Sequence, residues 1–311
     1  SPLVGWLSDK FGPRWMVIGG LFITGTGMVL MNYITTTWQY IVVWGGLIGL
    51  GLNIGLTVAC DKNINDWFIR RRGLAQGIKF GLISILAIVT IQVIAVLVIN
   101  EGWRYTCLIW GFIMYASIPF AYMLIRPRRP EHYGWLPDGA DIGDYHVASR
   151  EDLVLRGIGY ASGFQETDYS YVQAVRTATF WLLLAGFGVH IVIASGFNLH
   201  VYPFLTDIGM DEAASGMMIL MIVFTFPGRF LGGLIADRVP KLKLQLLLVV
   251  AFAFQVVGIT VYLLSGTTVA VYLLLACHGL STGAVTPVVL LMLGRYFGRK
   301  AFGSITGTLV A

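Results

Sequence analysis

The stretch GWLSDKFGPR, residues 5–14, decides the fold class of this chain because part of it occurs twice. A glycine followed four residues later by an aspartate, Gly5 and Asp9, recurs as Gly233 and Asp237, which is 228 residues further along. Each aspartate closes an apolar run and is followed by basic residues. The recurrence therefore raises the question of a repeat that spans the whole chain.

Two further pairs of stretches keep this register. GLNIG at residues 51–55 matches GLSTG at 279–283, again 228 residues apart, and WFIR at 67–70 matches YFGR at 296–299, 229 residues apart. Three pairs in register predict two structurally equivalent halves. Parallel repeats related by an axis along the membrane normal are a known transporter architecture.

The composition predicts an integral membrane protein built from helices. Of the 311 residues 57% are hydrophobic and 12% are charged, which is more apolar side chain than a soluble domain of this size needs. The apolar runs are long enough to cross about 30 Å of hydrocarbon as helices. We expect partial spans at 1–8 and 301–311, and complete spans at 15–34, 38–60, 73–99, 103–125, 178–205, 211–235, 243–264 and 268–293.

The basic residues predict the topology. Of the 21 lysines and arginines, 18 fall in or beside loops on one side of the membrane. Arg104 lies on the other side, and Lys79 and Arg229 lie within spans. Because short loops rich in Lys and Arg stay in the cytoplasm, we expect a multi-pass protein of the cell membrane with the loop 126–176 cytoplasmic. This placement explains the net charge of +5 without a nucleic-acid partner.

The repeat also predicts the domains. Asp237 follows about 60 residues of its own half but Asp9 follows only eight, so we expect about 50 residues before Ser1 and, by the same comparison, about 40 after Ala311. The intact protein would have two six-helix bundles, and this fragment would lack helix 1, most of helix 2, most of helix 11 and helix 12. The expected parts are an N-terminal bundle at 1–125, an exposed linker at 126–176 and a C-terminal bundle at 177–311.

Four loop motifs resemble the major facilitator superfamily. GWLSDKFGPR resembles its loop between helices 2 and 3, and GLIADR at 233–238 resembles the echo of that loop between helices 8 and 9. RRRGLAQG at 70–77 and RKAFGSITG at 299–307 resemble the loops that lead into helices 5 and 11. The resemblance covers essentially the whole chain and implies the all-α membrane fold of that superfamily.

Three other segments resemble one branch of it, the monocarboxylate porters and oxalate:formate antiporters. These are GLGLNIG at 49–55, RPRRPEHYGWLPDG at 126–139 and GRFLGGLIAD at 228–237. The branch uses an arginine of helix 8 to bind the substrate carboxylate, and Arg229 matches that position. Some members carry an aspartate one turn earlier, where this chain has Thr225. The lysines of helices 1 and 11 that the branch uses would lie outside the fragment.

Arg229 is the leading candidate for substrate binding. It lies about 12 Å of helix rise before Asp237, deep in a span where a charge is costly without a partner. No Asp or Glu falls in the middle of a complete span, so an anionic substrate is the missing partner. A guanidinium forks well onto a carboxylate. The alternatives are an arginine that reaches the cytoplasmic interface and one that belongs to a conformational network.

Further polar residues are weaker candidates. Asn53 lies on a glycine-rich helix face and His278 near the middle of a span, and each would line the pathway unless it only bonds helices together. An acid at a helix end can face the positive N-terminus of the next or a neighbouring helix, and an arginine close behind it can pair with it. The predicted gating residues are Gly5, Asp9, Arg14, Gly233, Asp237 and Arg238.

We therefore expect a secondary carrier of small mono- or dicarboxylates that works as a monomer, as an antiporter or as a proton-linked symporter. The alternatives are a carrier of a neutral solute, a drug-efflux protein and a transporter-like sensor. An enzyme, a cofactor and a metal site are not expected, because the sequence has no Walker loop and no Cys/His cluster. The bilayer and a proton or counter-anion are the other partners.

Overall fold

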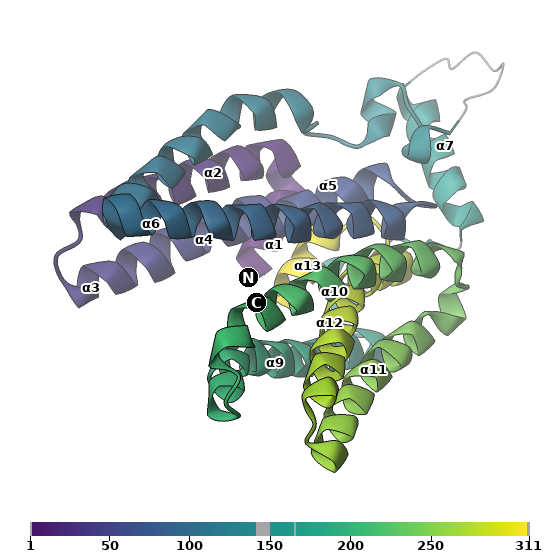
Figure 1. Cartoon of the computed structure of the whole chain (residues 1–311). Coiled ribbons are helices and arrows are strands. Elements are labelled where there is room, and N and C mark those ends of the chain that lie inside the picture. Colours follow the sequence, from purple (N-terminus) through teal and green to yellow (C-terminus); the bar gives the residue numbers. More distant parts are fainter. Residues whose placement is uncertain (1, 141–149, 165, 310–311) are drawn as a thin grey trace. The chain divides into compact units, whose positions relative to one another are not determined.

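The structure is a computed structural model and describes residues 2–140, 150–164 and 166–309. The linker residues 141–149 and 165, and the last two residues of the partial span 301–311, lie outside this part. Helices account for every regular element in the described residues (Figure 1). They are α1 Pro2–Phe11, α2 Pro13–Leu30, η1 Met31–Tyr33, α3 Thr37–Tyr40, η2 Ile41–Ile48, α4 Gly49–Leu52, η3 Asn53–Val58, α5 Ala59–Trp67, α6 Arg72–Leu124, η4 Pro130–Tyr133, η5 Pro137–Gly139, α7 Arg150–Gly163, α8 Tyr171–Val175, α9 Ala178–Asp207, α10 Asp211–Arg238, η6 Lys241–Lys243, α11 Leu244–Ser265, α12 Thr268–Phe297 and α13 Phe302–Leu309.

Seven helical segments in the described residues are long and apolar enough to cross a membrane. One of them, α6, has 53 residues and covers two of the eight predicted spans. Between those spans Gly102 adopts φ 83° and ψ 162°, a backbone conformation that glycine reaches without a steric penalty. Apart from single residues at the ends, all eight predicted segments fall within the observed ones, so the predicted all-α membrane architecture is confirmed. The seven are Pro13–Tyr33, Thr37–Trp67, Arg72–Leu124, Ala178–Asp207, Glu212–Arg238, Lys241–Ser265 and Thr268–Phe297.

Local sequence explains where two of these helices begin. The segment Thr37–Trp67 starts with a capping box, in which Gln39 N donates to Thr36 Oγ1 at 3.4 Å and Thr36 N donates to Gln39 Oε1 at 3.1 Å. Helix α2 starts with Pro13 directly after Gly12, whose φ of 81° turns the chain out of α1. These local signals set the first residue of each helix, which the apolar run alone does not define.

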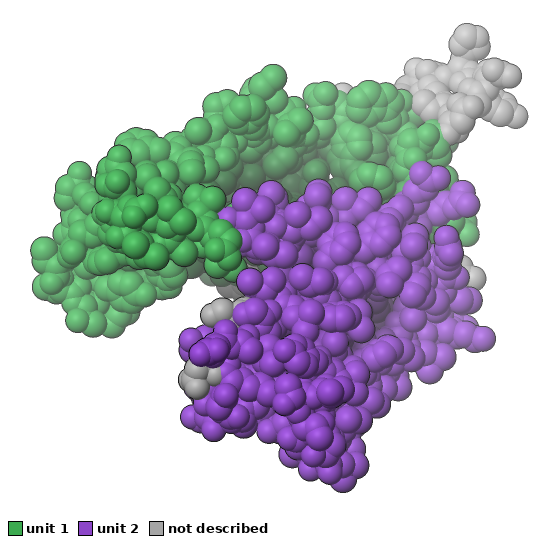
Figure 2. All heavy atoms as spheres, viewed as in Figure 1, with its two compact units in different colours: residues 1–69, 90–174, 297–311 green, residues 70–89, 175–296 purple. Residues whose placement is uncertain are grey.

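The chain forms two compact units, which Figure 2 shows in two colours. Unit 1 holds residues 1–69, 90–174 and 297–311, and unit 2 holds 70–89 and 175–296. Each unit therefore contains the start of a helix from the other predicted half of the sequence. The predicted bundle boundaries follow the order of the chain rather than these contacts and stay a prediction.

Close helix packing in unit 1 depends on small residues. A Cβ added to Gly20 of α2 would lie 2.6 Å from the Gly51 carbonyl oxygen, so the two backbones touch. Around this contact Met16, Val17 and Leu21 form a buried cluster with Ala59.

The core of unit 2 lies between α9, α10 and α12. A buried cluster joins the three helices, and α10 and α12 approach closely because Gly228 lies against the backbone of Leu280. The buried members of this cluster are Val201, Leu205, Ala214, Met217, Met221, Val271 and Leu275.

The composition of the linker suggested an exposed connection, but two of its acids, Glu131 and Glu166, are buried. Arg299, in the turn before α13, is 2% exposed and donates Nη1 to Glu131 Oε1 at 2.8 Å, and its Nε lies 3.7 Å from Glu166 Oε1. Asp168 accepts hydrogen bonds from the backbone N of Arg299 at 2.7 Å and of Lys300 at 3.0 Å. Burial alone would lower the pKa of Arg299, but the charges of Glu131 and Glu166 hold it above its ordinary value. Glu131, Glu166 and Asp168 of the linker thus bind the turn that leads into α13.

Replacing Arg299 with methionine should therefore destabilise the protein strongly. The substitution leaves Glu131 and Glu166 buried without their cation, and breaking a buried pair in this way costs about 3–5 kcal/mol. We expect a large drop in the unfolding midpoint in detergent, measured by fluorescence. The exposed Lys300→Met provides the control, and an equal midpoint for both variants would contradict the importance of the buried pair.

Candidate substrate and gating sites

The first predicted gating aspartate binds the start of another helix. Asp9, at the end of α1, accepts hydrogen bonds from Gly303 N at 3.1 Å and from Ser304 N at 2.8 Å and Oγ at 2.6 Å. Gly303 and Ser304 are the second and third residues of α13, where backbone N–H groups have no partner within the helix. Gly5, one turn earlier, lies against the Gly303 backbone, so α1 and α13 run side by side (Figure 1).

The second aspartate makes the same contacts in unit 2. Asp237, at the end of α10, accepts hydrogen bonds from Gly73 N at 2.8 Å and from Leu74 N at 2.7 Å. These are again the second and third residues of a helix, α6, and Gly233 lies against the Gly73 backbone. The two halves of the repeat thus share one device, a carboxylate that caps the positive end of a neighbouring helix. The sequence predicted this contact as one of two options.

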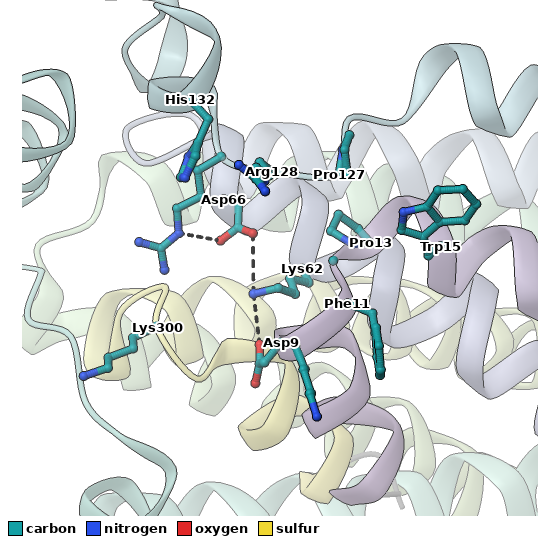
Figure 3. Close-up of a pocket in the computed structure, with 13 residues that line it drawn as sticks. Asp9, Phe11, Pro13, Trp15, Lys62, Asp66, Pro127, Arg128, His132 and Lys300 are labelled. Atoms are coloured by element: carbon teal, nitrogen blue, oxygen red, sulfur yellow. Dashed lines mark ion pairs between the residues drawn. The ribbon is translucent and has the colours of Figure 1, made fainter. Parts of the chain in front are cut away.

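The predicted pairing of these acids with Arg14 and Arg238 is not what the structure has. Arg14 Nε donates to the Ile125 carbonyl at 2.5 Å, and Arg238 is exposed and makes no ion pair among the described residues. Asp9 instead pairs with Lys62 Nζ at 2.9 Å (Figure 3). Neither arginine close behind an acid in sequence pairs with it in the described residues, and at Asp9 a lysine from another helix takes that place.

Two cations near the gating acids were missed. Lys62 lies one turn before Asp66, to which it also pairs at 3.5 Å, and this i,i+4 spacing could have identified it. Arg295 donates to the carbonyl oxygens of Asp237 at 3.0 Å and Val239 at 2.7 Å. Its role depends on the packing of α12 against the end of α10, for which the sequence holds no signal.

Arg229 lies half-buried on α10 and binds neutral acceptors of α6. Its Nη1 donates to the Phe80 carbonyl at 2.9 Å and to Ser84 Oγ at 2.6 Å, and its guanidinium carbon lies 5.8 Å from the centre of the Phe80 ring. In the part of the chain that the structure describes, no carboxylate pairs with it. The guanidinium is therefore held by hydrogen bonds to uncharged groups and keeps its full positive charge.

The remaining donors of Arg229 have no partner among the described residues. A guanidinium has five N–H groups, and Nη1 supplies both of the bonds just described. No hydrogen bond of Nε or Nη2 falls within the described residues. That edge of the guanidinium has the spacing that binds a carboxylate with two parallel hydrogen bonds.

The other two predicted substrate residues have local partners. Asn53 Nδ2 donates to the Gly49 carbonyl at 3.0 Å within its own helix, and Asn53 belongs to unit 1. His278, 1% exposed, stacks on Phe197 with ring centres 3.9 Å apart, and its Nδ1 lies 3.3 Å from Gln255 Nε2. These contacts pack His278 of α12 against α9 and α11, and they do not join it to Arg229. Within the described residues no group of three or more His, Cys, Asp or Glu would hold a metal ion.

Residues 1–311 match the Major Facilitator Superfamily over their whole length. The chain belongs to this superfamily. A solved member, the transporter FucP in its outward conformation, is 14% identical and superposes with a TM-score of 0.57, covering 99% of this chain and 76% of FucP. At that identity the likeness shows the fold alone.

Two of the curated relatives carry names that point to different functions. Monocarboxylate transporter 13 of Bos taurus is 25% identical over 301 residues, which is 96% of this chain and 63% of that protein. The Fujikurins efflux protein of Gibberella fujikuroi is 26% identical over 214 residues, 62% of this chain and 45% of that protein. The chain thus spans less than two thirds of these relatives. Both relatives are named for transport.

Proposed function

We propose that this chain belongs to a secondary carrier of small organic anions, mono- or dicarboxylates, that works by alternating access. Arg229 is the observation that carries the proposal, because it is a half-buried cation in a candidate span without a carboxylate partner among the described residues. The likeness to a monocarboxylate transporter supports the same substrate class.

In this proposal the substrate carboxylate binds the free edge of Arg229, formed by Nε and Nη2. The bonds from Nη1 to Phe80 and Ser84 hold the guanidinium in one orientation before the anion arrives. Such preorganisation lowers the entropy cost of binding. A bound carboxylate also neutralises the arginine, which lowers the free energy of the occluded state. The substrate therefore binds some conformations more tightly than others, as ligand-driven switching requires.

The two capping aspartates are the proposed gates. Asp9 holds the start of α13 against α1, and Asp237 holds the start of α6 against α10. Parting either pair of helices would expose two backbone N–H groups and one carboxylate, so each cap stabilises one conformation over the other. Gly5 and Gly233 allow the close approach that these bonds need. Arg14, at the start of α2, and Arg238, at the end of α10, would act without pairing with the acids.

The transport cycle has two candidate couplings, exchange with a second anion or symport with a proton. Thr225 occupies the position one turn before Arg229, so an aspartate–arginine pair cannot carry the proton there. His278 and Asn53 remain weaker candidates for the pathway. The proposed unit is a monomer in a cell membrane with the linker in the cytoplasm.

Efflux is the second candidate function, since one relative is named as an efflux protein, and we consider it for a neutral compound. Such a carrier would need no fixed cation in its binding site. Uptake and counterflow by the full-length protein in liposomes, with labelled carboxylates and neutral solutes of equal size, separates the two. The proposal expects counterflow with carboxylates alone, and counterflow with neutral solutes alone would overturn it. An imposed pH gradient then distinguishes symport from exchange.

A further inference from the structure

A polar cavity of about 510 Å³ lies in unit 1, whereas Arg229 belongs to unit 2. It is formed by the turn between α1 and α2, the end of α5 and the start of the linker, and Figure 3 shows its lining. Lys62 lies in it between Asp9 and Asp66, with Arg129 on the far side of Asp66. No part of the proposed transport function uses this cavity as a binding site.

The cavity carries more positive than negative charge. Its lining includes five lysines and arginines but only two carboxylates. Both carboxylates are already engaged, Asp9 by Lys62 and the start of α13, and Asp66 by Lys62 and by Arg129 at 3.5 Å. The three other cations have exposed side chains and no carboxylate partner in the described part of the chain, and they are Lys10, Arg128 and Lys300.

The position of the cavity matches the level of lipid headgroups. Four candidate spans begin or end at its lining. Pro13 is the first residue of one span, and Asp66 lies at the end of a second. Pro127 lies three residues after the end of a third span, and Lys300 lies three residues after the end of a fourth. Trp15 and Phe11 line the same cavity and are 57% and 52% exposed. Aromatic side chains gather at membrane interfaces, and the predicted cytoplasmic side faces the anionic leaflet.

We propose that this cavity binds the phosphate of an anionic phospholipid headgroup. Lys10, Arg128 and Lys300 supply the charge-assisted hydrogen bonds that a phosphate needs, while Trp15 and Phe11 contact the glycerol and upper acyl region. A soluble phosphate compound offers the same anionic group without the apolar part. The aromatic rim and the ends of the spans favour the lipid.

The test is native mass spectrometry of the full-length protein with added phosphatidylglycerol or phosphatidylcholine. The first variant combines Lys10→Gln, Arg128→Gln and Lys300→Gln. A matched control combines Arg176→Gln, Lys241→Gln and Lys243→Gln, which removes the same charge from loops on the same predicted side. Since each charge-assisted hydrogen bond to the phosphate contributes roughly a factor of ten or more, the first variant should bind phosphatidylglycerol at least about 100-fold more weakly. The control variant should bind it like the wild type.

Two results would overturn the proposal. Equal weakening in both variants would mean that phosphatidylglycerol is held by surface charge in general. Displacement of the lipid by millimolar glycerol phosphate, with equal affinity for that compound, would assign the cavity to a soluble phosphate ester. Unfolding midpoints measured for both variants show whether a loss of binding comes from a loss of structure. Because the readout is lipid binding, a failure of the anion-carrier proposal leaves this test unaffected.

Discussion

Replacing Arg229 with lysine should reduce carboxylate transport by roughly 100-fold or more. Lysine keeps the charge but cannot offer two parallel N–H groups, and each hydrogen bond between charged groups contributes about 1.5–3 kcal/mol. Arg229→Ala should abolish transport, because the charge is then lost as well. The measurement is initial-rate uptake of labelled carboxylates into liposomes, which gives kcat and KM separately.

Two variants distinguish a substrate role of Arg229 from a structural one. Arg104 also donates to a backbone carbonyl at 2.9 Å, that of Ile34, so Arg104→Lys is a matched control that should leave KM unchanged. Ser84→Ala removes one of the two acceptors of Arg229 and should retain transport, since the free Nε and Nη2 edge is untouched. If Ser84→Ala were as damaging as Arg229→Ala, the arginine would serve to join α6 to α10 instead.

Asp9→Asn and Asp237→Asn should each slow transport by about 10- to 100-fold with little change in substrate affinity. An amide presents one oxygen where the carboxylate presented two, and its NH₂ group faces backbone donors, so one hydrogen bond of about 1.5–3 kcal/mol is lost. The cap would then hold its pair of helices less firmly. Uptake at saturating substrate measures the rate.

Labelling of a buried cysteine would report the separation of α1 and α13 directly. Ile305 of α13 is fully buried, so an Ile305→Cys probe in a background without native cysteines should react slowly when Asp9 is present. Asp9→Asn should make this probe react faster. Asp207→Asn, at the end of α9, is the control. An unchanged labelling rate in the Asp9 variant would mean that the cap does not hold these helices together.

The sequence predicted those features that depend on a single property of a short stretch, such as its apolar length. Apolar length gave the spans, and the repeat identified Asp9 and Asp237 as equivalent residues. That equivalence holds in detail, because each acid binds the second and third N–H groups of a helix. The neighbour in question could not be read from the chain, since Gly303 is 294 residues from Asp9.

Side-chain partners chosen by tertiary packing were beyond the sequence. Arg14 follows Asp9 closely and has the right charge, yet Lys62 takes the carboxylate because α5 brings it there. The linker composition indicated an exposed segment, whereas Glu131 and Glu166 are buried against Arg299. Composition averages over a segment, and it cannot reveal two buried acids within a polar one.

Equilibrium binding of matched ligands is the sharpest test of whether Arg229 binds a carboxylate. The measurement compares a carboxylate with its neutral carboxamide of the same shape, on wild-type protein and on Arg229→Ala, by isothermal titration. We expect the wild type to bind the carboxylate and to discriminate strongly against the carboxamide, and we expect Arg229→Ala to lose this discrimination. Equal preference for the carboxylate in both proteins would contradict the claim.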